Sequence, residues 1–142
     1  MKIAIVNGPN LNLTGKREKD LYGDKTFDGF ISEIKKGFPQ IEIDFYQSNV
    51  EGELIDRLHA LDNDASVKGV LLNAGGYTHT SVAIGDAVAA IDTPVIEIHM
   101  SNVFAREDFR HVSFVGKYAI GTIAGFGMES YLLGILKLVN QG

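Results

Sequence analysis

The sequence predicts an α/β fold, in which a parallel sheet is covered by helices on both faces. Short apolar runs rich in β-branched residues alternate five times with longer stretches whose apolar residues recur at helical spacing. Such alternation is typical of strand–helix–strand units with right-handed crossovers, which build parallel sheets. No internal repeat or low-complexity segment interrupts the pattern.

The length and composition fit a single globular domain, residues 1–142. Hydrophobic residues make up 45% of the chain, which is enough for a core, and the net charge of -5 argues against non-specific binding to nucleic acid or anionic membranes. The absence of cysteine excludes disulfides, thiolate metal sites and cysteine catalysis. No apolar run is long enough for a signal-peptide core or a membrane span, so we expect a cytoplasmic protein.

The first strand is expected at residues 2–6, a short apolar run that ends in an asparagine-rich turn at 7–12. For Asn7 we favour simple turn chemistry, because asparagine tolerates unusual backbone angles. The polar, glycine-bounded segment 13–25 has no period. A segment of this kind beside a strand end is where lids occur, although a solvated charged loop is the commoner case. Its notable residues are Arg17 and Tyr22.

The next stretch is expected to form a helix, a strand and a second helix. Apolar residues recur at helical spacing in 26–37, where Thr26 can cap the first turn. Residues 41–46 alternate between apolar and polar side chains, which predicts a strand at the edge of the sheet. Residues 51–63 have the pattern of an amphipathic helix.

The third strand, 67–72, runs into a turn that begins at Asn73 and is rich in glycine and hydroxyl residues. Glycines let backbone approach a ligand, and a capped helix offers free N–H groups that attract anions. An ordinary turn would need fewer such groups, so we favour a ligand site that includes Asn73 and His79. The following helix, 82–91, is apolar except for Asp86, which either faces solvent or reaches a partner subunit.

The fourth strand contains Glu97 and His99, which share a face because they are two residues apart. A carboxylate beside an imidazole can fix the tautomer of the ring and raise its basicity, although a surface histidine with a chance neighbour is the alternative. The charged stretch 104–111 predicts a short helix whose arginines hold an anion or form surface pairs. A strand at 118–124 and an amphipathic helix at 128–139 complete the chain.

This order of elements most resembles a flavodoxin-like three-layer sandwich, with a five-stranded parallel sheet in the order 2-1-3-4-5. In that order the first and third strands flank the switch point, where open sheets bind ligands at the carboxyl ends of their strands. The site should therefore combine the lid and the arginine segment with Asn10, Asn73, Glu97 and His99.

These residues favour proton transfer on a polar, anionic small molecule. Ser101 lies on no nucleophile elbow, no His-x-x-His or Glu-x-x-His spacing suggests a metal, and no phosphate-binding glycine loop follows the first strand. A tyrosine base needs its pKa, normally about 10, brought down, and an adjacent guanidinium favours the phenolate. Tyr22, beside Arg17, could remove a proton next to a carbonyl while His99 protonates a leaving hydroxyl, which is a β-elimination of water.

Five motifs in order resemble those of type II 3-dehydroquinate dehydratase, across essentially the whole chain. They are Asn-Gly-Pro-Asn-Leu-Asn-Leu at 7–13, Arg-Glu-x-x-x-Tyr-Gly at 17–23, Asn-Ala-Gly-Gly-x-Thr-His-Thr-Ser at 73–81, Glu-x-His-x-Ser-Asn at 97–102 and Arg-Glu-x-Phe-Arg at 106–110. One motif alone would be weak, whereas five in order are specific. The family usually has proline where this chain has Lys19, and because proline restricts the backbone we expect a more mobile lid here.

The resemblance implies a shikimate-pathway enzyme that serves chorismate and aromatic amino acid biosynthesis. It would convert 3-dehydroquinate to 3-dehydroshikimate by anti elimination through an enolate, without a cofactor or a metal. Tyr22 would be the base, with its pKa lowered by Arg17, and His99 would be the acid, oriented by Glu97. Asn10 would hold a water at the enolate oxygen.

The resemblance further implies an assembly and a set of substrate contacts. The assembly would be a homododecamer built as a tetramer of trimers, in which Asp86 contacts the site of a neighbouring subunit. Arg106 would lie near the lid. The residues implied to bind the substrate's carboxylate and hydroxyls are Asn73, His79, Met100, Ser101 and Arg110.

A flavodoxin-like module that binds a small ligand or transmits a signal, without catalysis, is the alternative function. A receiver-type module would have acidic residues after the first strand, where this chain has Asn7. A flavin module would have a hydroxyl-rich phosphate loop there, which the Asn-Gly-Pro-Asn turn does not provide.

Overall fold

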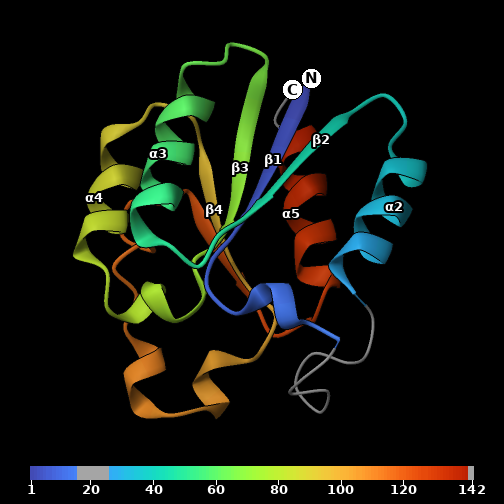
Figure 1. Cartoon of the computed structure of the whole chain (residues 1–142). Helices are drawn as coiled ribbons and strands as arrows, with labels where there is room; N and C mark the ends of the chain where they lie inside the picture. The colour runs from blue at the N-terminus through green and yellow to red at the C-terminus, as the bar shows by residue number, and fades with distance from the viewer. Residues whose placement is uncertain (16–25, 141–142) are drawn as a thin grey trace.

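The computed structural model describes residues 1–15 and 26–140, and these form a five-stranded parallel sheet (Figure 1). The strand order is β2-β1-β3-β4-β5, which confirms the predicted topology. The short apolar runs of the sequence lie in the centre of this sheet, and the alternating run lies at one edge as β2, as expected. The strands are β1 (Lys2–Asn7), β2 (Glu42–Gln47), β3 (Val67–Asn73), β4 (Val95–His99) and β5 (Gly121–Ala124).

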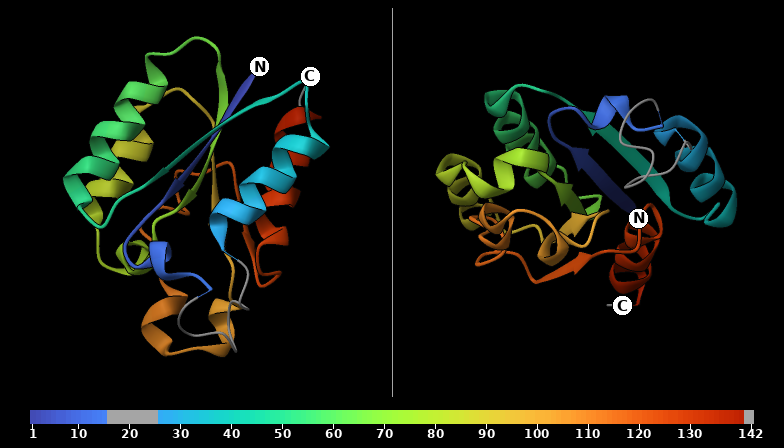
Figure 2. Two further views of the ribbon diagram at one scale, coloured as in Figure 1. Left: turned by 45° about the vertical axis from the view of Figure 1, so that its right-hand side comes forward. Right: turned by 90° about the horizontal axis from the view of Figure 1, so that it is seen from below.

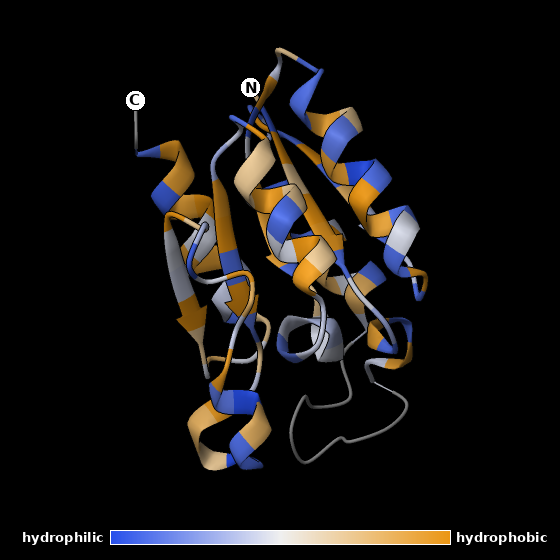
Figure 3. Ribbon diagram, turned by 90° about the vertical axis from the view of Figure 1, so that its left-hand side faces the viewer, coloured by the Kyte–Doolittle hydropathy of each residue, from blue (hydrophilic) through white to orange (hydrophobic). Residues whose placement is uncertain are grey.

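Within the described residues, two helices cover each face of the sheet, and Figures 1 and 2 show how they flank it. One face carries α2 (Phe27–Gly37) and α5 (Glu129–Val139), and the other carries α3 (Glu51–Asp62) and α4 (Val82–Ala90). Successive strand residues point to opposite faces, so the sheet contributes to two separate apolar cores. Figure 3 shows the apolar residues concentrated on the strands and on the helix faces turned toward them.

Two helix caps follow the sequence prediction. Thr26 accepts a hydrogen bond from the Gly29 N–H at the start of α2. Of the three hydroxyl residues that could cap α4, Ser81 does so, because its Oγ accepts from the Ile84 N–H at 2.9 Å. Within residues 1–15 and 26–140, no helix combines the length and the apolar character needed to cross a bilayer.

In residues 1–15 and 26–140, four short 3-10 helices lie beyond the carboxyl ends of the strands. The single short helix predicted for 104–111 is wrong, because Arg106 has an extended backbone that separates two of these turns. The turn at 103–105 begins where the Asn102 side chain accepts a hydrogen bond from the Phe104 N–H. The four are η1 (Leu11–Leu13), η2 (Gly75–His79), η3 (Val103–Ala105) and η4 (Asp108–His111).

Two further expectations need correction. The fifth strand begins at Gly121 rather than at Tyr118, because the N–H groups of Tyr118 and Ala119 both donate to the Val115 carbonyl and form a turn. Asn7 is not a turn residue: it ends β1, is fully buried, and its Oδ1 accepts from the Tyr131 hydroxyl at 2.8 Å. The unusual backbone angle belongs to Asn10, whose φ is 70°.

Candidate functional site

A pocket opens at the carboxyl ends of β1, β3 and β4, where the sheet order predicts a ligand site. Main-chain contacts there are close, since the Gly8 N–H donates to the Asn73 carbonyl at 2.7 Å. The structure places most of the predicted site residues around this one pocket. Those in its lining are Asn10, Asn73, His79, His99, Met100, Ser101, Arg106 and Arg110.

Asn10 is held at the rim of the pocket by the segment that follows β2. Its N–H donates to Oδ1 of Asn49 at 2.9 Å, and the Gln47 amide donates to the Gly8 carbonyl at 3.1 Å. With φ at 70°, the backbone of Asn10 is left-handed, a conformation that asparagine adopts more readily than most residues. The Asn-Gly-Pro-Asn turn therefore presents Asn10 to the pocket with its main chain fixed from two sides.

Glu97 and His99 form a buried hydrogen-bonded pair, as their spacing predicts. Nε2 of His99 lies 2.7 Å from Oε2 of Glu97, and the two residues are only 7% and 2% exposed. Burial raises the pKa of Glu97, but hydrogen bonds from His99 and Ser113 outweigh this effect, so the net pKa lies below its ordinary value. The ionised carboxylate can only accept, so Nε2 carries the proton and Nδ1 is left as the second reactive atom of the ring.

His79 stacks near His99, with the two ring centroids 6.1 Å apart. Its Nδ1 lies 2.7 Å from the Val112 carbonyl, which fixes Nδ1 as the donor and Nε2 as the free acceptor in the neutral ring. Burial lowers the pKa of His79, and the nearby His99 and Arg110 lower it further. His79 is therefore neutral at pH 7 and suited to bind a hydroxyl rather than to carry charge.

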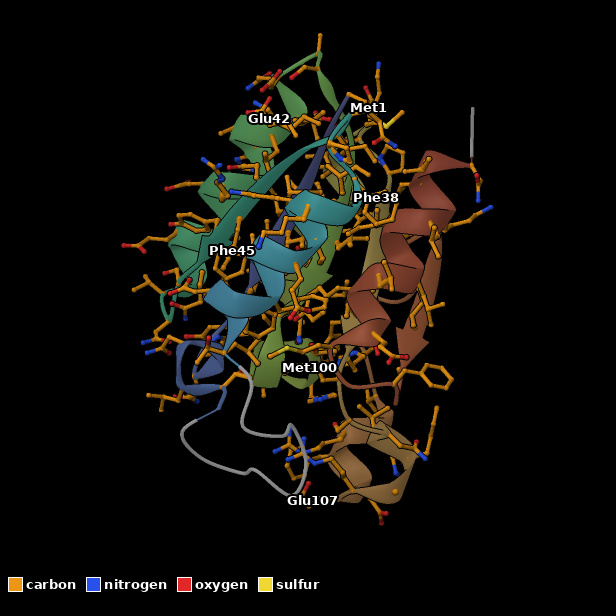
Figure 4. The ribbon with its side chains drawn as sticks, turned by 90° about the vertical axis from the view of Figure 1, so that its right-hand side faces the viewer. Met1, Phe38, Glu42, Phe45, Met100 and Glu107 are labelled. Carbon is orange, nitrogen blue, oxygen red and sulfur yellow. The ribbon has the colours of Figure 1, made fainter. Side chains whose placement is uncertain are left out.

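Two arginines bring positive charge to the lining of the pocket. The guanidinium of Arg106 donates to Oγ of Ser101 at 3.2 Å, and Nε of Arg110 donates to Glu107 at 2.6 Å while stacking on Phe109. Figure 4 shows Met100 at the end of the sheet and Glu107 at the tip of the η3–η4 segment. Guanidinium groups in such a place suit a carboxylate ligand.

Asn73 is oriented by a buried tyrosine of α5, a helix whose sequence pattern predicts only an amphipathic face. The Asn73 amide donates to the Tyr131 hydroxyl at 2.9 Å, and that hydroxyl donates to Oδ1 of Asn7. Tyr131 is fully buried and packs edge-to-face against Phe27, with centroids 5.2 Å apart. No local pattern could reveal this role, because Tyr131 and Asn7 lie 124 residues apart.

We expect Tyr131→Phe to lower the free energy of unfolding by about 1–3 kcal/mol, because it removes a hydrogen-bond partner from two buried amides. Urea denaturation at fixed protein concentration measures this loss. Tyr46→Phe, on the edge strand β2, keeps the ring that contacts Arg57 and is the matched control. Equal midpoints for the two variants would contradict the role assigned to the Tyr131 hydroxyl.

Four predicted site residues are not in the lining of this pocket: Glu97, which is joined to it through the hydrogen bond with His99, and Arg17, Tyr22 and Asp86. Arg17 and Tyr22 lie outside the described residues, as does Lys19. Asp86 is exposed on α4 and lines a second, separate hollow, together with Ser113, Lys117 and Tyr118. Within one subunit, therefore, Asp86 does not face the pocket around His99.

The geometry combines an oriented imidazole, amide groups and guanidinium groups in one partly enclosed pocket, which is suited to acid–base chemistry on an anion. Within residues 1–15 and 26–140, no group of three or more histidine or acidic residues could hold a metal ion. Because one carboxylate orients the ring of His99, that ring is the candidate proton donor or acceptor.

Comparisons with known proteins identify similar chains along the whole length. The family model described as "Dehydroquinase class II" matches residues 1–139. A "3-dehydroquinate dehydratase" of Exiguobacterium sp. (strain ATCC BAA-1283 / AT1b) is 52% identical, with 99% of this chain and 96% of the relative covered. One of Chlorobaculum tepidum is 46% identical over 99% and 95%. The crystal structure of a type II dehydroquinase from Butyrivibrio crossotus DSM 2876 has a TM-score of 0.93 at 40% identity, covering 98% of this chain and 97% of that one.

Proposed function

Because the chain belongs to the class II dehydroquinase family, we propose that its pocket removes water from 3-dehydroquinate to give 3-dehydroshikimate. The protein is a type II 3-dehydroquinate dehydratase, a hydro-lyase of the shikimate pathway. The observation that carries the local proposal is the buried Glu97–His99 pair at the wall of the pocket. Residues 1–142 would form a single catalytic domain.

The reaction proceeds by anti elimination through an enolate, without a cofactor or a metal. Tyr22, as a phenolate favoured by Arg17, removes the proton next to the ketone, and the electron pair moves onto the carbonyl oxygen. Asn10 holds a water that stabilises this enolate oxygen. The enolate then collapses, the carbon–carbon double bond forms, and the doubly protonated ring of His99 gives its Nδ1 proton to the departing hydroxyl, which leaves as water, while the Nε2–H stays bonded to Glu97.

The substrate's polar groups match the lining of the pocket. Its carboxylate and hydroxyls would be bound by main chain and side chains at the ends of β3 and β4, with His79 as a neutral partner for a hydroxyl. Arg106 would lie near the lid. The remaining substrate-binding residues are Asn73, Met100, Ser101 and Arg110.

We propose that the chain assembles into a homododecamer, a tetramer of trimers, in which Asp86 contacts the site of a neighbour. Six large apolar side chains between residues 104 and 126 are more than 40% exposed. Assembly would cover exposed apolar surface of this kind, and sedimentation would measure the assembly directly. These side chains are Phe104, Phe109, Val112, Tyr118, Ile120 and Phe126.

Ultraviolet absorbance on mixing the protein with 3-dehydroquinate tests the reaction, because the new double bond of the product is conjugated with its ketone. We expect absorbance to rise, to rise equally with a metal chelator, and to be abolished in Tyr22→Phe. Tyr46→Phe, on the edge strand β2, is the control and should behave as the wild type. No rise with the wild type would overturn the proposed reaction, and a rise in Tyr22→Phe would overturn the proposed base.

A further inference from the structure

We propose that the hydroxyls of Ser113 and Thr122 are positioning groups that hold the Glu97 carboxylate in the orientation that binds Nε2 of His99. This inference deepens the proposed function, because it concerns how the acid of that reaction is held. Neither hydroxyl lines the pocket around His99, and no sequence motif identified either residue.

The register of the sheet places Thr122 beside Glu97. In the parallel pairing of β4 with β5, Glu97 is the partner of Thr122, so both side chains lie on the same face. The Thr122 hydroxyl donates to Oε1 of Glu97 at 3.0 Å. In the part of the chain that the structure describes, this is the single side-chain hydrogen bond of Thr122, so its hydroxyl stabilises no other group there.

The hydroxyl of Ser113 is directed at the other carboxylate oxygen. Its Oγ accepts from the N–H groups of Val115 at 3.2 Å and Gly116 at 2.9 Å, which occupy the acceptor sites of the oxygen. The one hydrogen of the hydroxyl is therefore free to donate to Oε2 of Glu97, which lies 2.7 Å away. Oε2 thus accepts from both Ser113 and His99, while Oε1 accepts from Thr122.

The main chain at Gly116 packs closely against the carboxylate. A Cβ at Gly116 would lie 2.8 Å from Oε1 of Glu97 and 3.3 Å from Oγ of Ser113, so only glycine fits there without displacing one of them. The carboxylate is 2% exposed, and a buried charge is tolerated where its oxygens are hydrogen-bonded. Loss of either hydroxyl would allow the carboxylate to rotate away from His99.

The charged and titratable groups around Glu97 set the direction of the pH effect. They are His99 on the same strand and His79 of η2. Donors to a carboxylate favour its charged form, so removing one raises the pKa of Glu97. Activity that needs the ionised carboxylate is lost as the pH falls through that pKa, so the acid limb of the kcat profile moves to higher pH in the variants.

Thr122→Val tests the proposal with little change of side-chain volume. We expect kcat to fall about 3- to 10-fold with KM within about twofold of wild type, and the acid limb to move up by about half a pH unit. Thr122→Ser, which keeps the hydroxyl, should restore both values. Ser113→Ala should change kcat in the same direction, and sedimentation of each variant checks that assembly is unchanged.

Thr93→Val is the matched control, because the Thr93 hydroxyl donates to the Asp62 carboxylate at 2.7 Å, before β4 begins and away from the pocket. It should leave kcat and the acid limb unchanged. If Thr122→Val behaves like Thr93→Val, or if Thr122→Ser fails to restore activity, the proposal is overturned.

Nitrogen NMR of the imidazole separates this proposal from the proposed function. At a pH at which the ring is neutral, wild type should show His99 with its proton on Nε2. A double variant of Ser113→Ala with Thr122→Val should then show a mixture of the two tautomers. This readout needs no turnover, so it stands even if the wild type does not act on 3-dehydroquinate. An unchanged tautomer in the double variant would overturn the positioning role alone.

Discussion

Replacing His99 with glutamine is expected to lower kcat for 3-dehydroquinate by about 10²- to 10⁴-fold, the range found for loss of a general acid. Glutamine can still donate an N–H to the Glu97 carboxylate, which now takes that hydrogen bond from Nε2 of the ring. It cannot release a proton to the departing hydroxyl. The variant therefore removes the proton transfer while leaving the buried charge of Glu97 with a partner.

The experiment needs a histidine outside the pocket for comparison, and His59→Gln provides it. His59 is exposed on α3, on the solvent side of a helix that does not line the pocket. We expect wild-type kcat for His59→Gln. For both variants we expect the free energy of unfolding to stay within about 1 kcal/mol of the wild-type value. A loss of less than tenfold in His99→Gln would mean that another group, or water, supplies the proton.

The sequence predicted those parts of the site that depend on periodicity within one element. Glu97 and His99 share a face because strand side chains alternate, and the structure brings them within hydrogen-bond distance. Asn10 and Asn73 meet because the first and third strands are neighbours in the sheet order, which the alternation of elements predicted. The fold was predictable for the same reason, since burial on both faces requires the apolar runs that define each strand.

The parts that could not be predicted depend on contacts between residues distant in sequence. Thr122 reaches Glu97 only because β5 pairs with β4 in one particular register, and the sequence also placed the start of β5 three residues too early. Tyr131 reads as an ordinary apolar helix residue, yet its hydroxyl joins two strand ends. Polar contacts of this kind leave no period in the sequence, because each involves one atom pair.

A methyl group added at Gly8 is expected to disrupt the junction of β1 and β3 on which the pocket is built. A Cβ there would lie 2.4 Å from the Ala74 carbonyl oxygen and 2.6 Å from its carbon, both of which are main-chain atoms. Main chain cannot turn aside as a side chain can, so the strand ends must separate. The Gly8 N–H bond to the Asn73 carbonyl would lengthen from 2.7 Å.

We expect Gly8→Ala to lower the free energy of unfolding by about 2–4 kcal/mol, through overpacking and through weakening of this buried hydrogen bond. Gly52→Ala is the matched control, because a Cβ at Gly52 meets nothing within 4 Å and alanine favours the helix α3, so stability should stay the same or rise by up to about 1 kcal/mol. Urea denaturation at one protein concentration compares the two, since assembly would make the midpoints concentration-dependent.

The same substitution links stability to activity. Gly8 lies between Asn7, whose side chain accepts a hydrogen bond from Tyr131, and Asn10, which lines the pocket. Its N–H donates to the Asn73 carbonyl. Displacing it moves amides on both sides of the switch point, so kcat for 3-dehydroquinate should fall even where Gly8→Ala remains folded. Unchanged stability together with unchanged kcat would show that the two strand ends can separate without cost, and that the pocket does not depend on their close approach.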